Sequence, residues 1–292
     1  MHNGNCVSIN LSSCIRLWRT PFRISTVFTI IFENQGRAKV LSDPYFLSLK
    51  ERGYFMSNYH AVSHPSQPNY IALVSGSTNG CRSDFSIDIG ANSIVDLLEA
   101  KGLTWKAYNE GFPGNCFTES YSDRYVRKHN PFMSFNNIRN DPKRCANIVS
   151  ADELKVDEQT GTLPNYILFT PDMDNDGHDT GVPYSSAWLK EFLEPKLANP
   201  VYANTLFHIT YDEDGYDTLT NNIYSLFLGK GILAKGVVDN TWYTHYSALA
   251  TVEELFGLGS LGKGDATTRK IPLICNSTRP SFHSLYKLIS DE

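Results

Sequence analysis

Acidic and amide side chains follow three apolar runs of this chain, each at the point where the run ends. They are Glu33 and Asn34 after residues 27–32, Asp172, Asp174, Asp176 and Asp179 after residues 166–170, and Asp212, Glu213 and Asp214 after residues 205–211. Ligands of an open α/β sheet bind beyond the carboxyl ends of its strands, so we expect the three clusters to converge. Packed carboxylates repel one another, and a divalent cation between them relieves that repulsion. The alternative for any one cluster is a solvated turn.

A serine stands where the sequence predicts the start of a helix. In residues 64–69 (HPSQPN), Pro68 suits the first helical position, because the N–H that proline lacks is not needed there. Ser66 then lies at or just before a helix N-terminus, where free backbone donors and the helix dipole favour an anion such as phosphate. A neighbouring metal or base activates such a hydroxyl as a nucleophile. The alternative for Ser66 taken alone is a helix N-cap.

Two histidines have a sequence context that suggests chemistry. His178 lies among acidic residues in a glycine-containing loop, which favours the protonated form that a general acid requires. A surface histidine in a polar turn is the alternative. His245 stands at the start of an expected helix. His129, His208 and His283 have no such context, and we expect them to be incidental, with His208 packed inside a strand.

Composition excludes several classes of protein. The chain has 292 residues and a formal net charge of −5, which argues against nucleic-acid binding, because that function needs a basic face. No apolar run reaches the ~18 residues of a transmembrane helix. Residues 1–22 contain arginines but no apolar run typical of a secretion signal.

Apolar runs alternate with helical patterns along most of the chain. Strands are expected at residues 27–32, 54–59, 103–108, 166–170, 205–211 and 223–228, and helices at 44–52, 68–74, 93–100, 185–197 and 245–256. This alternation predicts an α/β fold, with a mostly parallel central sheet and helices on both faces. Residues 111–161 are polar and carry few strand signals, which indicates a loop-rich insertion or cap. We expect one domain over 23–275, a poorly defined segment at 1–22 and a tail at 276–292.

Six cysteines are present, and none of them forms a CxxC pair. Cys116 and Cys145 lie in a region rich in Gly, Asn and Pro, where a disulfide would close a loop. Two buried free thiols are the alternative.

Taken in order, these motifs resemble the phosphoesterase family of fungal and bacterial acid phosphatases and phospholipases C, within the alkaline-phosphatase-like superfamily. The resemblance runs from about residue 28 to residue 265. It rests on residues 32–34 (FEN), 63–70 (SHPSQPNY) with 76–78 (GST), 175–180 (NDGHDT), 212–214 (DED) and 243–247 (YTHYS). It implies an alkaline-phosphatase-like fold and hydrolysis of a phosphoric ester.

The resemblance also implies roles for individual residues. Ser66 would be the nucleophile, and His178 or His64 would protonate the leaving alcohol. One divalent metal ion, Mg, Mn, Ca or Zn, would be bound by Glu33, Asn34, Asp212 and Glu213. Residues expected to contact the substrate are Asn34, Asn69, Asp179, Asn222 and His245.

Three alternatives stay open. The substrate is a small phosphate ester or a phospholipid head group, so a phospholipase C competes with an acid phosphatase. Residues of the expected cap could line a lipid groove or form an ordinary core: Phe112, Phe117, Phe132, Met133 and Phe135. Relatives often carry histidine at the position of Asn222. Because an asparagine cannot donate a proton as an acid, the third alternative is a non-catalytic binding protein. The resemblance implies a secreted, cell-wall or vacuolar protein, although no signal peptide is visible.

Overall fold

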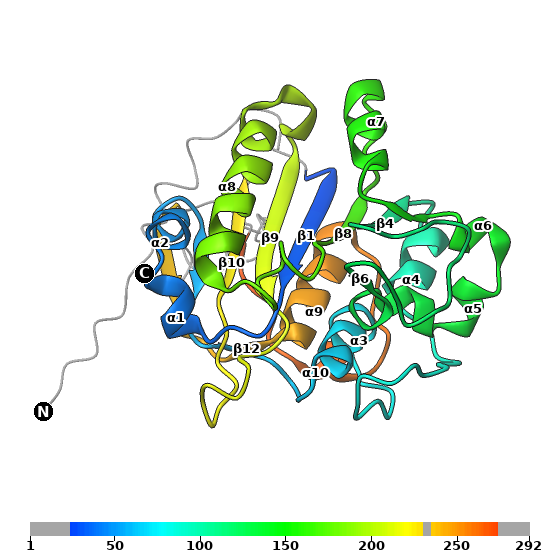
Figure 1. The fold of residues 1–292 in the computed structure, drawn as a ribbon, viewed down its shortest axis with the longest axis horizontal. Coiled ribbons are helices and arrows are strands. Elements are labelled where there is room, and N and C mark those ends of the chain that lie inside the picture. The colour runs from blue at the N-terminus through cyan, green and yellow to red at the C-terminus, as the bar shows by residue number, and fades with distance from the viewer. Residues whose placement is uncertain (1–23, 230–234, 274–292) are drawn as a thin grey trace, which may run out of the picture.

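A computed structural model describes residues 24–229 and 235–273 of the chain. The expected segments at 1–22 and 276–292 lie outside these residues, as does His283. The main sheet has eight strands in the order β11-β2-β10-β9-β1-β8-β4-β7. Its strands are β1 (Thr26–Phe32), β2 (Tyr54–Met56), β4 (Trp105–Asn109), β7 (Ile148–Ser150), β8 (Tyr166–Thr170), β9 (Thr205–Tyr211), β10 (Ser225–Gly229) and β11 (Val237–Asp239). The expected α/β fold is confirmed (Figure 1).

The centre of the sheet is parallel. β1 pairs in parallel with β8 on one side and with β9 on the other, whereas β10 runs antiparallel to both β9 and β2. Every residue of β1 is buried, as expected for a strand covered on both faces. Two small sheets pair β3 (Tyr59–His60) with β12 (Tyr243–Thr244) and β5 (Tyr121–Ser122) with β6 (Tyr125–Val126).

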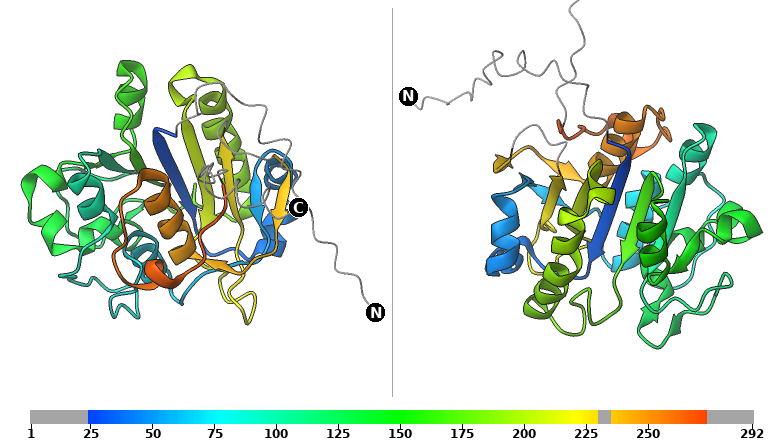
Figure 2. Two further views of the ribbon diagram at one scale, coloured as in Figure 1. Left: turned by 180° about the vertical axis from the view of Figure 1, so that it is seen from behind. Right: turned by 90° about the horizontal axis from the view of Figure 1, so that it is seen from above.

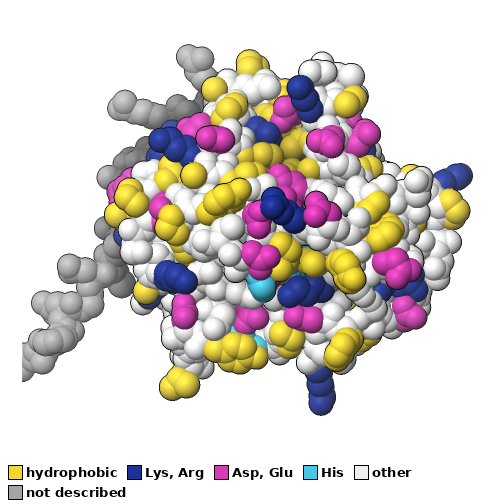
Figure 3. Space-filling view, viewed as in Figure 1, with side chains coloured by type: hydrophobic (Ala, Val, Ile, Leu, Met, Phe, Trp, Pro, Cys, Tyr) yellow, Lys and Arg dark blue, Asp and Glu magenta, His cyan; other side chains and the backbone are white. Residues whose placement is uncertain are grey.

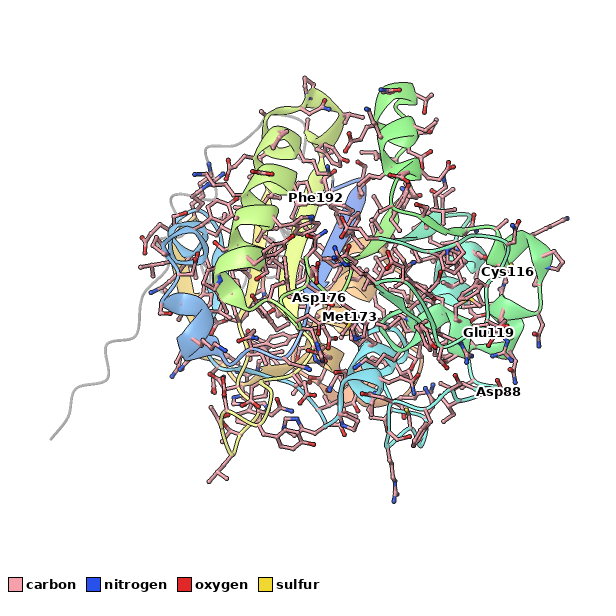
Figure 4. All side chains as sticks on the ribbon, viewed as in Figure 1. Asp88, Cys116, Glu119, Met173, Asp176 and Phe192 are labelled. Carbon is pink, nitrogen blue, oxygen red and sulfur yellow. A yellow bond between two sulfur atoms is a disulfide. The ribbon has the colours of Figure 1, made fainter. Side chains whose placement is uncertain are left out.

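Helices cover both faces of the main sheet (Figure 2). On one face lie α2 (Pro44–Lys50) and α8 (Val182–Ala198), and on the other α3 (Ser66–Ser75), α4 (Ile94–Ala100) and α9 (His245–Phe256). Phe192 of α8 packs on Phe169 of β8, with ring centroids 4.5 Å apart (Figure 4). The remaining helices are α1 (Arg37–Leu41), α5 (Asn136–Arg139), α6 (Pro142–Cys145), α7 (Glu153–Thr160), α10 (Gly264–Thr267) and the 3₁₀ turns η2 (Arg127–His129), η3 (Pro131–Ser134) and η4 (Pro200–Tyr202).

The segment 111–161 is loop-rich, as expected, but it also completes the sheet. It contains the hairpin β5–β6 and several short helices, and its strand β7 pairs with β4 at the edge of the main sheet. A disulfide joins Cys116 to Cys145, which confirms that expectation. The apolar cap residues Phe112, Phe132, Met133 and Phe135 are buried and Phe117 is partly buried, so they form an ordinary core.

Most expected elements are present, with shifts that have local causes. The strand expected at 54–59 is wrong as a single element, because the chain turns between β2 and β3, which belong to different sheets. α3 begins at Ser66, two residues before Pro68. Proline is tolerated there because the first N–H groups of a helix have no intrahelical partner. Ser93 caps α4 with its hydroxyl, so the helix expected from residue 93 begins at Ile94.

Candidate active site

The three acidic clusters meet at one edge of the sheet, as the sequence predicted. The chain leaves β1, β8 and β9 at the lower edge of the sheet in Figure 1. Backbone hydrogen bonds join the three exits: Asp212 N–H donates to the Phe32 carbonyl at 2.9 Å, and Glu33 N–H donates to the Asp176 carbonyl at 3.1 Å. Asn34 N–H donates to Asp212 Oδ1 at 3.0 Å. The topology therefore fixes these carboxylates next to one another.

Ser66 faces this cluster from the first turn of α3. The Ser66 hydroxyl donates to Glu33 Oε2 at 3.0 Å. The Asn34 amide lies 3.2 Å from Ser66 Oγ. Pro65 occupies the N-cap position, so the N-cap reading of Ser66 is wrong. The serine oxygen is thus held against a carboxylate at a helix start, where the positive end of the helix dipole favours a phosphoryl group.

Asn69 holds the loop that leads into Ser66. Its Oδ1 accepts from the N–H groups of Val62 and Ser63 at 3.0 and 3.1 Å, and its Nδ2 donates to the carbonyls of Ser63 and Pro65 at 2.8 and 3.1 Å. Asn69 is fully buried. In this structure the whole amide is bonded to the backbone of the loop, and its expected contact with substrate stays a prediction.

His129 is buried between two of the carboxylates. Its Nε2 lies 3.1 Å from Glu33 Oε1, and its Nδ1 lies 3.5 Å from Asp176 Oδ2. Burial alone lowers the pKa of His129, but the charges and hydrogen bonds of these two carboxylates raise it to about 9. Burial raises the pKa of Glu33, and the charge and hydrogen bond of His129 outweigh that effect and lower it to about 2. The expectation that His129 is incidental is wrong.

No local pattern marks His129, because its partners are distant in the sequence. Tyr70 extends the same cluster: its hydroxyl donates to Glu33 Oε1 at 2.5 Å, and its ring stacks on the imidazole of His129, with centroids 5.0 Å apart. His208, by contrast, is packed inside β9 as expected, where its Nε2 lies 3.0 Å from the Ser225 hydroxyl.

Three of the four expected metal ligands lie together. The Asn34 amide lies 3.2 to 3.3 Å from both carboxylate oxygens of Asp212, and its nitrogen is the atom that matches these acceptors; half a turn of the amide presents its oxygen instead. Burial, and next the charge of Glu33, raise the pKa of Asp212 well above its usual value. Two buried carboxylates and an amide oxygen are the hard donors that Mg, Mn or Ca prefers. The residues present therefore fit a divalent cation.

Glu213, the fourth expected ligand, turns toward His64 in this structure. His64 Nδ1 makes a hydrogen bond with Glu213 Oε2, and its Nε2 lies 3.8 Å from Asp214 Oδ1. The His64 ring stacks on Tyr216, with centroids 4.0 Å apart. Within residues 24–229 and 235–273, no three His, Cys, Asp or Glu side chains group closely enough to hold a metal without help. The fit above therefore depends on Asn34.

His178 and Asp179 lie at the surface of the site. His178 N–H donates to Asp176 Oδ1 at 2.8 Å, and its Nδ1 lies 2.6 Å from Asp179 Oδ1. Figure 3 shows histidine side chains reaching the surface in the lower half of the molecule, among acidic and basic groups. Asp176 itself is buried in the loop between β8 and α8 (Figure 4). His178 is therefore open to a substrate that approaches this edge.

His245 and Asn222 lie behind the site and not in contact with Ser66. His245 is fully buried, and its Nε2 donates to the Asp212 carbonyl at 2.7 Å. The Asn222 amide donates to the Tyr59 carbonyl at 2.9 Å. Both side chains position the backbone around the carboxylates, and their expected contact with substrate stays a prediction.

Comparison with known proteins decides the family. The model of the phosphoesterase family matches residues 40–259. The chain belongs to the phosphoesterase family. The chain is 35% identical to a protein of Aspergillus fumigatus named acid phosphatase, over 86% of this chain and 59% of that protein. It is 32% identical to the phosphatidylinositol-3-phosphatase of Mycobacterium tuberculosis, over 81% of this chain and 78% of that protein.

The chain matches part of the length of its relatives, and its fold matches that of solved structures. The chain spans about 60% of the length of the first fungal relatives it matches, 62% and 59%. A solved protein of the alkaline phosphatase superfamily from Vibrio parahaemolyticus superposes with a TM-score of 0.61 at 14% identity, over 84% of this chain and 70% of that one. At that identity the match supports the expected fold alone. Among the described residues, no helix is both long and apolar enough to cross a membrane.

Proposed function

We propose that this phosphoesterase hydrolyses phosphoric monoesters, as an acid phosphatase with Ser66 as nucleophile and a phosphoserine intermediate. The observation that carries the proposal is the position of the Ser66 hydroxyl, at the start of α3 and 3.0 Å from Glu33 Oε2. The acid phosphatases among its relatives support the same activity.

In the first step, Ser66 Oγ attacks phosphorus as its proton passes along the hydrogen bond to Glu33 Oε2, while the bond to the leaving alcohol oxygen breaks. The hydrogen bond to Glu33 and the contact with Asn34 orient the serine oxygen, and the positive end of the α3 dipole stabilises the negative charge of the non-bridging oxygens. In the second step, water attacks phosphorus and gives one proton to a histidine at the rim. The bond to Ser66 Oγ breaks, this oxygen recovers its proton from Glu33, and inorganic phosphate leaves.

A histidine at the rim gives a proton to the leaving alcohol. His64 is two residues before the nucleophile, and its hydrogen bond to Glu213 fixes its ring. His178 is the other candidate, since its Nδ1 is engaged by Asp179 while the ring lies partly exposed. We assign the proton to one of these two groups, and the pH profiles of His64→Gln and His178→Gln separate them.

We propose that Glu33, Asn34 and Asp212 hold one divalent cation, with Glu213 as a further ligand after a side-chain rotation. When bound, such a cation lowers the pKa of the serine hydroxyl and offsets charge on the phosphoryl oxygens. Oxygen donors favour Mg, Mn or Ca over Zn.

Monoesters are favoured over phospholipid diesters by the buried cap residues. Phe112, Phe132, Met133 and Phe135 are part of the core and do not line a lipid groove. A secreted, cell-wall or vacuolar location belongs to the same proposal, and the disulfide between Cys116 and Cys145 supports an oxidising compartment.

The test is hydrolysis of a chromogenic phosphate monoester between pH ~4 and ~9, a span that brackets carboxylate and histidine titration. Wild type, Ser66→Ala and Ser48→Ala, which changes an exposed serine of α2, are compared with and without a chelator. We expect Ser66→Ala to lose at least ~10³-fold in turnover and Ser48→Ala to keep it. Loss of activity on chelation supports the cation. Turnover of a phosphate diester alone supports the phospholipase C alternative, and no turnover of any ester supports the non-catalytic one.

A further inference from the structure

Lys128 is linked to the first turn of α3 through a contact with Asp84. It lies in η2, and its Nζ is 3.1 Å from Asp84 Oδ2. The other oxygen of Asp84 accepts from the backbone N–H of Gln67 at 3.0 Å. Gln67 follows Ser66 in the first turn of α3, so one carboxylate links the lysine to the helix start.

A second, independent route fixes η2 against Ser66. His129, the residue after Lys128, contacts Glu33 Oε1 at 3.1 Å, and the other Glu33 oxygen accepts from the Ser66 hydroxyl at 3.0 Å. The turn η2 is therefore linked to the start of α3 by two routes, one through Asp84 and one through Glu33. This arrangement restricts where the ammonium group can move.

The ammonium group lies within the electrostatic reach of the acidic cluster. Burial lowers the pKa of Lys128, but the charges of Glu33, Asp84 and Asp212 raise it above its usual value. Its side chain is 18% exposed, so the charge is shielded from solvent without being closed off.

A phosphate dianion that enters this site meets several carboxylates. Glu33 and Asp212 are buried next to Ser66, and Asp176 and Glu213 are buried beside His129 and His64. A fixed positive charge on the substrate side offsets this repulsion, because charge-assisted hydrogen bonds to phosphate are strong and direct.

We propose that Lys128 is a substrate-binding residue, whose ammonium group moves from Asp84 to a non-bridging oxygen of the phosphoryl group at Ser66. Asp84 keeps its bond to Gln67 and holds the lysine in place before substrate arrives. This inference rests on the proposed function, since it assumes that phosphate binds at Ser66. The competing reading is a structural ion pair that attaches the loop around Asp84 to η2.

The test measures the affinity of inorganic phosphate by calorimetry in the inactive Ser66→Ala background, so that it does not depend on turnover. We expect Lys128→Met to weaken phosphate binding by at least ~10-fold and Lys128→Arg to restore most of it, as a charge-assisted bond requires. Lys106→Met, which breaks the Lys106–Asp157 pair on β4, is the matched control and leaves affinity unchanged. Asp84→Asn breaks the Lys128–Asp84 pair but keeps the ammonium group of Lys128, so we expect phosphate to bind at least as tightly as in the parent protein.

Two results would overturn the inference. The first is that Lys128→Met binds phosphate as tightly as the parent protein. The second is that Lys128→Met and Asp84→Asn lose phosphate affinity equally. Either result would mean that Lys128 has only a structural role. If Lys128→Met does not fold, the rate of chemical acetylation of Lys128 is measured in the wild type with and without phosphate. The proposal predicts that phosphate slows acetylation, and an unchanged rate would reject the contact. Hydrolysis by the wild type is measured in parallel, so failure of the proposed function, seen as no turnover, is distinct from failure of the Lys128 contact.

Discussion

His129 Nε2 lies 3.1 Å from Glu33 Oε1 in the fully buried centre of the site. The other ring nitrogen of His129 faces Asp176, so one imidazole sits between carboxylates from two strand ends. Since Glu33 also accepts from Ser66, we propose that His129 positions the Ser66 hydroxyl through Glu33.

We predict that His129→Ala destabilises the fold by about 3–5 kcal/mol, because it leaves two buried carboxylates without their partner. His129→Gln keeps a donor and costs less. Urea unfolding of both variants measures the effect, and His208→Gln, at a buried histidine with no carboxylate partner in the described residues, is the control. A loss below ~1 kcal/mol in His129→Ala would mean that the cluster is not held by this histidine.

The hydrogen bonds of Asn69 to the loop before Ser66 lead us to expect that its substitution affects kcat more than KM. Asn69→Ala removes four hydrogen bonds that fix the loop before Ser66, which we expect to cost about 1–3 kcal/mol and to lower kcat more than it raises KM. Asn69→Asp keeps the two accepted bonds and loses the two donated ones, so it is intermediate. A rise in KM at constant kcat would instead indicate the direct substrate contact expected from the sequence.

Glu253 predicts a pH dependence of stability away from the catalytic residues. Burial, and next the charge of Asp265, raise the pKa of Glu253 to about 8. The folded state then keeps a proton that the unfolded state has lost, so stability is highest below the usual carboxyl pKa and falls as the pH rises toward 8.

Thermal unfolding from pH ~4 to ~9 measures this slope, and Glu253→Gln removes it because a neutral amide replaces the titrating group. We expect the variant to be more stable than wild type above pH 8 and similar at acidic pH. Parallel curves for the two proteins across the whole range would contradict this assignment.

The disulfide predicts a local loss of stability on reduction. Cys116 and Cys145 are 29 residues apart, and closing a loop of that size contributes about 3–4 kcal/mol in the chain-entropy estimate. We expect a reducing agent to lower the thermal midpoint of the wild type, whereas a Cys116→Ser, Cys145→Ser protein starts lower and does not respond. A wild type that is equally stable in both conditions would show that the bond adds nothing.

The sequence predicted those parts of the site that follow from strand ends. Glu33, Asn34 and Asp212 could be placed together because each follows an apolar run, and parallel strands bring such positions to one edge. Ser66 could be placed at a helix start from Pro68. The order of the strands was not predictable, because it depends on crossover connections that local periodicity does not encode.

The sequence did not show which groups the side chains of His129 and Asn69 contact. His129 contacts Glu33 across a separation of 96 residues, so no spacing pattern marks it. Asn69 was expected to face the substrate, but its amide is used entirely on the loop beside it. Both cases concern side chains whose hydrogen-bond partners are backbone or long-range groups, which the residue type alone does not specify.

The central claim is that Ser66 becomes covalently phosphorylated. Wild type and Ser66→Ala are each mixed with a phosphate monoester, quenched in acid during turnover, digested and analysed by mass spectrometry. We predict phosphoserine at Ser66 in the wild type, with Ser48 unmodified, and neither phosphoserine nor turnover in Ser66→Ala. Turnover that persists in Ser66→Ala, or phosphate found on another residue, would contradict the account.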